Sequence, residues 1–165
     1  MSSLSGLMQI EVTQDDRTLQ EIFSRVRRQR KYSQEYLQDI VNRESTLTVQ
    51  RPGQVHRIGI VPQYKFSPGP GTVRSLIRIA EEEHNLQRFP LVVALLIAEK
   101  YHLHDLGCDF LIFAHHWAHL PRPSNPGKSR RYVLGITGSD KLFAYREQRD
   151  LISHQADFAF AMPSS

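Results

Sequence analysis

The sequence predicts one α+β domain, on the basis of three observations. The chain has 165 residues, of which 40% are hydrophobic, and this suits a single hydrophobic core. Amphipathic stretches of helical period alternate with β-branched stretches that favour strands. Clusters of proline and glycine separate these stretches. We therefore expect residues 1–165 to form a single domain with a helical arm at 1–45. The α+β core at 46–165 should contain two β-hairpins and a buried central helical hairpin.

The arm is predicted to be helical after a frayed start, with Asp15 or Asp16 as the helix cap. Four apolar residues then follow helical spacing and should face the core: Leu19, Ile22, Phe23 and Val26. A second set continues this period after a break near Ser33: Tyr36, Leu37, Ile40 and Val41. The arm is thus one kinked helix or two short helices.

The chain changes to β-branched residues at Thr46, which predicts the first hairpin. Its arms are Thr46–Gln50 and Val55–Val61, and Arg51–Gln54 has the proline and glycine of a type II turn. The segment Ser67–Gly71 is rich in proline and glycine and is expected to be a loop.

Two helices should follow this loop. Thr72 can cap the first, which ends near Asn85, and Pro90 opens the second, which continues to about Leu103. We expect the two to form the central helical hairpin. The second helix is apolar nearly all round from Leu91 to Ala98, which predicts the most buried element of the fold.

The last third of the chain mixes strands with one helix. Cys108–Ala114 is short, apolar and aromatic, as expected of a buried strand. A loop is predicted at 121–128, followed by the second hairpin, formed by Arg131–Thr137 and Lys141–Tyr145. The tail from Glu147 to about Phe160 is expected to be helical, with Leu151, Ile152 and Phe158 partly inward.

Composition limits the environment and the partners. The single cysteine, Cys108, cannot form an internal disulfide, and Met1–Leu4 lacks the features of a signal peptide, so we expect a reducing compartment, most simply the cytoplasm. The longest apolar run, Phe89–Ala98, is about ten residues, whereas a membrane span needs about twenty. The net charge of +4 permits an anionic partner without requiring one. The sequence leaves open whether the chain forms a homodimer.

Histidines are crowded in one part of the chain. Five of the eight lie close together: His102, His104, His115, His116 and His119. His115 and His119 have a spacing that can aim two rings at one ion from a helix, and His102 and His104 have the equivalent strand spacing. Asp105 or Asp109 could complete such a shell or orient a ring.

The histidines have a structural interpretation as well, and the sequence favours it. No established zinc motif is present, and histidines are common where a helix ends, as is expected at His102 and His104. A five-residue strand between the two histidine groups would hold them roughly 17 Å apart. The alternative is a metal-dependent hydrolase or nuclease, in which His102, His104, His115 and His119 supply the ligands of a divalent metal.

A basic stretch is the second functional signal. Five cations precede the Ser-Gln-Glu sequence at 33–35: Arg25, Arg27, Arg28, Arg30 and Lys31. Over about twenty residues this resembles the opening of a repressor-type helix-turn-helix domain, which implies nucleic-acid binding. That family needs a recognition helix next. Here the segment from Ser45 to Gly53 favours a strand and a turn, so no base-reading residue is carried over.

These observations favour a noncatalytic binding or regulatory module without a cofactor. Its partner is a protein or a nucleic acid, and the basic N-terminal helix is the expected contact in the second case. Further basic residues are scattered along the sequence: Arg51, His56, Arg57, Arg74, Arg78, Arg122, Lys128, Arg130 and Arg131.

Overall fold

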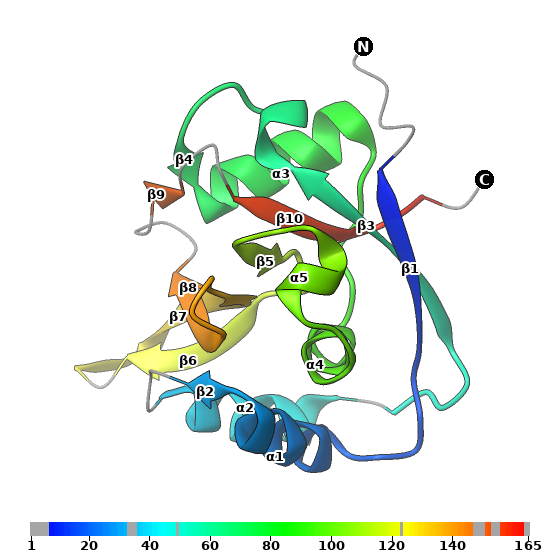
Figure 1. Cartoon of the computed structure of the whole chain (residues 1–165). Helices are drawn as coiled ribbons and strands as arrows, with labels where there is room; N and C mark the ends of the chain where they lie inside the picture. The colour runs from blue at the N-terminus through cyan, green and yellow to red at the C-terminus, as the bar shows by residue number, and fades with distance from the viewer. Residues whose placement is uncertain are drawn as a thin grey trace.

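The structure, a computed structural model, describes residues 7–32, 36–48, 50–122, 124–146, 151–152 and 156–163. These residues form a mixed α+β fold with five α-helices and a mostly antiparallel sheet of eight strands, which confirms the predicted class. In Figure 1 the helix α3 (Val73–His84) lies above the sheet, and α1 (Leu19–Gln29), α2 (Tyr36–Leu47) and α4 (Leu91–Lys100) lie below it. The sheet is thus the middle of three layers.

The main sheet joins segments from both ends of the chain. Its path runs through seven strands, in the order β1 (Met8–Thr13), β3 (Val55–Pro62), β10 (Asp157–Ala161), β5 (Leu111–Phe113), β7 (Asn125–Ile136), β8 (Lys141–Arg146) and β2 (Lys31–Tyr32). The eighth strand, β6 (Ala118–Arg122), pairs with β7 off this path. Two pairs, β10 with β5 and β2 with β8, are parallel. A separate small sheet joins β4 (Gly71–Thr72) to β9 (Leu151–Ile152).

The predicted N-terminal helices are present as α1 and α2. The apolar face of α1 is buried as expected, but the predicted cap at Asp15 or Asp16 is wrong. Thr18 caps α1, because its hydroxyl accepts the Glu21 N–H at 3.1 Å while the Glu21 carboxylate accepts the Thr18 N–H at 3.2 Å. The expected break at Ser33 lies outside the described residues, as does the side chain of Tyr36.

The first predicted hairpin is wrong in one arm. Residues 46 and 47 belong to α2, and the partner of β3 is β1, in the segment expected to be frayed. The turn itself is present, because the Gln54 N–H donates to the Arg51 carbonyl at 3.2 Å and Gly53 has a φ of 86°. The helix α2 continues to Leu47, into the segment that was predicted to be a strand. The β-branched residues of that segment indicated a strand, but strand propensity depends on context and does not by itself determine the local structure.

The two central helices have nearly the predicted bounds but not the predicted arrangement. Thr72 caps α3, Asn85 ends it with a φ of 55°, and α4 is buried throughout Leu91–Ala98. They do not form a helical hairpin, because α3 packs into the cluster above the sheet and α4 into the cluster with α1 and α2 below it. The short helix α5 (Leu103–Leu106) and the 3-10 turn at Gln63–Lys65 complete the helical part.

Two predictions for the last third of the chain are wrong. The expected loop at 121–128 includes the ends of β6 and β7, which pair with each other, and the expected helical tail contains β9 and the central strand β10. Residues 147–150 and 153–155 of that tail lie outside the described part. The predicted hairpin around Gly138–Asp140 is confirmed as β7 and β8. A buried strand is present within the predicted segment Cys108–Ala114, but it covers only Leu111–Phe113, as β5. No helix in the described residues is long and apolar enough to cross a bilayer.

Candidate nucleic-acid interface

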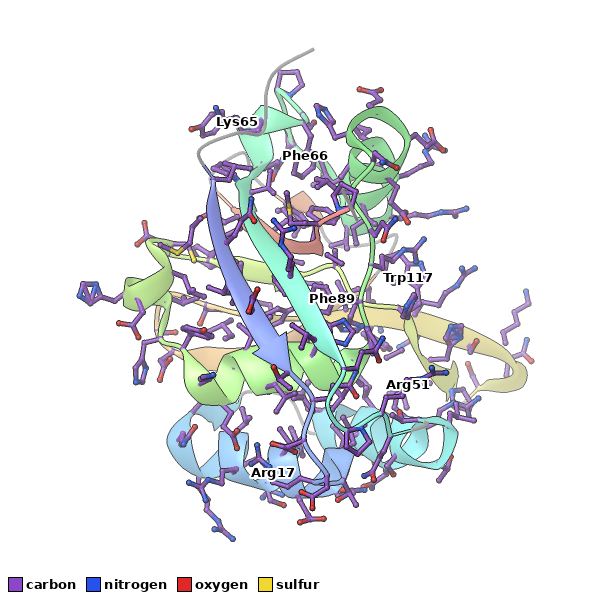
Figure 2. The ribbon with its side chains drawn as sticks, turned by 90° about the vertical axis from the view of Figure 1, so that its right-hand side faces the viewer. Arg17, Arg51, Lys65, Phe66, Phe89 and Trp117 are labelled. Atoms are coloured by element: carbon purple, nitrogen blue, oxygen red, sulfur yellow. The ribbon has the colours of Figure 1, made fainter. Side chains whose placement is uncertain are left out.

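A two-stranded ribbon extends from the sheet at β6 and β7. The two strands pair from Ala118 with Tyr132 out to Arg122 with Asn125, whereas β8 pairs only with residues 132–136 of β7. No other described strand pairs with residues 125–131 of β7. Figures 1 and 2 both show this ribbon reaching beyond the rest of the molecule, in Figure 2 as the yellow strands on the right. We call residues 118–131 the basic ribbon.

The ribbon carries cations without any acidic residue. Its four cations are Arg122, Lys128, Arg130 and Arg131. No aspartate or glutamate occurs between Asp109 and Asp140. Lys128 and Arg131 are exposed and Arg130 is half-buried, and no described carboxylate is within ion-pairing distance of Lys128 or Arg130. This concentration of positive charge is what a polyanion requires.

The ribbon carries basic side chains on both of its faces. Successive residues of a strand point to opposite faces, so Arg130 and Arg131 are divided between them. Tyr132, on the Arg130 side, is buried in the cluster below the sheet, and Val133, on the Arg131 side, is buried in the cluster above it. The Arg130 face therefore lies toward α2 and the Arg131 face toward α3.

Prolines protect the ribbon from pairing with another strand. Pro121 lies in β6 and Pro126 in β7. Since proline has no N–H to donate, an exposed edge that contains it is a poor template for a further strand. The ribbon is thus suited to contacts through its side chains rather than to extension of the sheet.

The base of the ribbon is fixed by His115. Five residues, 113–117, stand opposite only Val133 and Leu134 of β7, so the chain bulges there. His115 Nε2 accepts the Leu134 N–H at 2.9 Å, and its Nδ1 lies 2.6 Å from the His116 carbonyl oxygen, which can only accept. The proton is therefore on Nδ1. Burial lowers the pKa of His115 to about 4, so the ring is neutral.

Helix α2 lies beside the base of the ribbon. The Glu44 carboxylate accepts the His119 N–H at 3.3 Å, and Leu120 packs against the cluster that contains α2. These contacts fix where the ribbon leaves the body of the protein.

The predicted basic helix is only partly available to a ligand. Arg30, 5% exposed, donates through Nε to the Ala98 carbonyl at 2.8 Å and through its other nitrogens to the Tyr101 carbonyl and the Asp140 carboxylate. These contacts join the end of α1 to the end of α4 and to the β7–β8 turn. Burial lowers the pKa of Arg30. Arg30 is thus a structural residue.

The other cations of this stretch differ from Arg30. Arg25, Arg27 and Arg28 are exposed, and Arg27 and Arg28 line a surface hollow of about 300 Å³ with Ser24. Arg25 lies 3.9 Å from the Glu99 carboxylate, and Arg27 donates to the Gln38 side chain at 2.9 Å. Lys31 is in β2, and its side chain lies outside the described part.

The resemblance to a helix-turn-helix domain ends at α2. In the place of a recognition helix, the chain makes the turn at Pro52 and Gly53 and enters β3, as the sequence predicted. A repressor-like docking mode, which needs that helix in the major groove, is therefore not supported.

The four histidines of the metal alternative do not come together. His102 and His104 are exposed at α5, before β5, and His115 and His119 follow that strand. Both ring nitrogens of His115 are engaged in hydrogen bonds, which leaves no lone pair for a metal. Asp105 accepts the His102 N–H at 3.1 Å. In the described part of the chain no group of three His, Cys, Asp or Glu side chains could hold a metal ion.

Cys108 is not an activated nucleophile. Burial, followed by the charges of Asp157 and Asp109, raises the pKa of its thiol to about 12. The thiolate is the reactive form, so Cys108 is protonated and unreactive at neutral pH.

The sequence analysis missed the ribbon because its prolines and glycine indicate a loop. The sequence feature that could have identified the ribbon is the absence of acidic residues from 110 to 139, around four cations. No protein-family model matches the chain, and no curated protein or solved structure shows significant similarity to it.

Proposed function

We propose that this chain is a noncatalytic nucleic-acid-binding module whose main contact is the basic ribbon. The observation that carries the proposal is a projecting ribbon with four cations and no acidic residue. Lysine and arginine that neutralise phosphates release condensed counterions, and this release supplies much of the affinity of nucleic-acid-binding proteins. The exposed cations of α1 are a second, smaller contact.

A protein partner has less support. Exposed apolar patches of several hundred Å² usually mark such interfaces. The exposed large hydrophobic side chains of the described chain come from five separate segments: Met8, Leu47, Val55, Tyr64 and Phe110. None of the five lies on the basic ribbon, so these side chains do not mark the ribbon as a protein-binding surface.

The metal-dependent hydrolase or nuclease also has less support. Its four histidines lie on both sides of β5, and His115 uses both ring nitrogens within the fold. A catalytic metal needs three protein ligands around one point and an open position for water.

The proposal is tested by charge reversal on the ribbon. Lys128→Glu/Arg130→Glu should weaken binding to a mixed-sequence nucleic-acid pool by at least about tenfold, measured by fluorescence anisotropy at fixed salt. The matched control is Arg74→Glu/Arg78→Glu, which reverses two exposed cations on α3. It makes the same change in net charge and should weaken binding by less than about threefold. Equal losses in the two variants, or no binding by the unmodified protein, would overturn the proposal.

A further inference from the structure

We infer that the ligand is duplex DNA and that the basic ribbon enters its major groove. This inference rests on the proposed function and specifies which nucleic acid the ribbon recognises. Three features of the ribbon support it: the side chains it lacks, its dimensions, and the placement of its cations.

The ribbon offers little platform on which unpaired bases could stack, because its one aromatic ring is the half-buried His119. Residues 118–131 contain no phenylalanine, tyrosine or tryptophan. Proteins that bind single strands combine a basic groove with aromatic side chains, and each stacked base contributes about 1–3 kcal/mol. A ribbon of arginine, lysine, serine and asparagine is instead equipped for phosphates and for the hydrogen-bonding edges of paired bases.

The aromatic side chains at the base of the ribbon are already in use. Tyr132 is 3% exposed within the lower cluster. Trp117, labelled in Figure 2, packs against the upper cluster, and the Arg88 guanidinium lies 5.3 Å from its ring centroid. Arg88 is fixed there because it donates to both oxygens of the Glu81 carboxylate, at 3.1 and 3.2 Å. The Tyr132 ring is thus closed to a base, and the partly buried Trp117 ring already has a partner in Arg88.

The ribbon has the size that a major groove admits. Two paired strands lie about 4.8 Å apart, and the major groove of B-DNA is about 12 Å wide and 8.5 Å deep. Residues 125–131 of β7 span about 23 Å at 3.3 Å per residue, which exceeds the depth of the groove. The ribbon can thus reach the floor of the groove while the body of the protein stays outside.

The cations are arranged for a groove with a phosphate backbone on each side. Arg130 and Arg131 leave opposite faces of the ribbon, and Lys128 is exposed nearer its tip. Asn125 and Ser129 are also exposed and add polar groups that can bond to base edges. Duplex RNA offers no equivalent site, because its major groove is deep and narrow.

The test compares three fluorescent ligands of one mixed sequence: a 20-base-pair DNA duplex, its single strand, and the matching RNA duplex. The intact protein should bind the DNA duplex at least about tenfold more tightly than the other two, and Lys128→Glu/Arg130→Glu should remove this preference. Methyl green, which occupies the major groove, should displace the protein from the duplex, and netropsin, which occupies the minor groove, should not.

The outcomes separate this inference from the proposed function. Ribbon-dependent binding that is as tight for the single strand or for the RNA duplex would overturn the inference and leave the proposed function intact. Displacement by netropsin alone would do the same. Binding that the ribbon variant retains in full, or no binding to any of the three ligands, would overturn both.

Discussion

The two basic segments of this protein look alike in sequence and differ in structure. Residues 25–31 contain five cations and residues 122–131 contain four. In the first segment Arg30 is buried, Arg25 lies near Glu99, and Arg27 bonds to Gln38. In the second, the ribbon extends from the sheet and no described carboxylate pairs with Lys128 or Arg130. A cluster of charges therefore indicates a binding surface only when the fold leaves cations such as Lys128 and Arg130 without an ion pair in the described part of the chain.

The difference comes from partners that are distant in sequence. The acceptors of Arg30 lie 68, 71 and 110 positions away. No local pattern reports such contacts, whereas the absence of acidic residues around the ribbon is visible in the sequence alone.

The largest expected effect is on stability at Arg30. Arg30→Ala leaves the buried Ala98 carbonyl and the partly buried Tyr101 carbonyl without this donor, and we expect the free energy of unfolding to fall by about 3 kcal/mol. The Asp140 side chain is 47% exposed and can be rehydrated, which keeps the loss near the lower end for a buried pair. Urea denaturation measures the change.

The matched change on the ribbon is Arg130→Ala, which should alter the free energy of unfolding by less than about 0.5 kcal/mol. If the two variants lost similar stability, the distinction between the two basic segments would be wrong. Arg30→Lys should recover only part of the loss, because an ammonium cannot serve three separated acceptors in the geometry of a guanidinium.

The second prediction concerns the histidine that anchors the ribbon. The pKa of His115 is lowered to about 4 by burial, and in the unfolded chain it is about 6.5. Between these values the unfolded state holds the extra proton. His115 therefore contributes stability that is fully present above about pH 6.5 and is lost as the pH falls toward about 4, by about 3 kcal/mol.

Asp157 opposes this dependence. Burial, with a further contribution from the charge of Asp109, raises the pKa of Asp157 to about 6, above its unfolded value of about 3.9. Here the folded state holds the extra proton, so the contribution of Asp157 is greatest at low pH and is lost as the pH rises through about 6. The two dependences largely cancel between about pH 4 and 6.

Single variants separate the two groups. Asp157→Asn should reveal a loss of stability on acidification with a slope of about one proton, and His115→Gln should give the opposite sign. Urea denaturation from pH 4 to 7 measures both slopes, and His104→Gln, at an exposed histidine, is the control. Slopes that neither variant changes would show that the bulge is not held by a neutral imidazole.

The third and smallest effect is expected at the surface network that ties the start of α1 to α4. Arg17 donates to both Glu99 oxygens, at 2.5 and 2.7 Å, and to Asp15 at 2.8 Å. The hydrogen bond that Asp15 accepts from the Arg17 side chain lowers the pKa of Asp15. Since both Arg17 and Glu99 are partly exposed, Glu99→Gln should cost only about 1 kcal/mol.

The effect of salt on stability distinguishes this network from the contacts of Arg30. The cost of Glu99→Gln, measured by urea denaturation, should shrink at 1 M salt, whereas the cost of Arg30→Ala should largely persist because the guanidinium and its contact with the Ala98 carbonyl are buried. A loss at Glu99 as large as that at Arg30, and equally insensitive to salt, would contradict this ranking of the two sites.

Local signals predicted the parts of the fold that depend on neighbouring residues. The helix α3 was predicted from its cap at Thr72 to its end at Asn85, because both ends are determined by adjacent residues. Strands β1 and β10 were missed. Their pairing joins the two ends of the chain through β3, and a five-residue strand that is buried on both faces, such as β10, has little periodicity to detect.

The site was predicted less well than the fold. The cations of the first basic segment were chosen for their density, and the burial of Arg30 depends on contacts across the fold. The neutral state of His115 likewise depends on Leu134, which is close to it only because of the bulge. In both cases the sequence grouped the residue with its neighbours by type and density, whereas its role is determined by partners from tertiary structure.

The salt dependence of DNA binding tests the central claim most directly. The logarithm of affinity falls with the logarithm of salt concentration by about 0.9 per phosphate contact. Lys128→Gln/Arg130→Gln should therefore reduce this slope by about two, and Arg27→Gln/Arg28→Gln should reduce it by less than one. That result would identify the ribbon as the main phosphate contact. A slope that falls by about two in the helix variant and is unchanged in the ribbon variant would contradict the account.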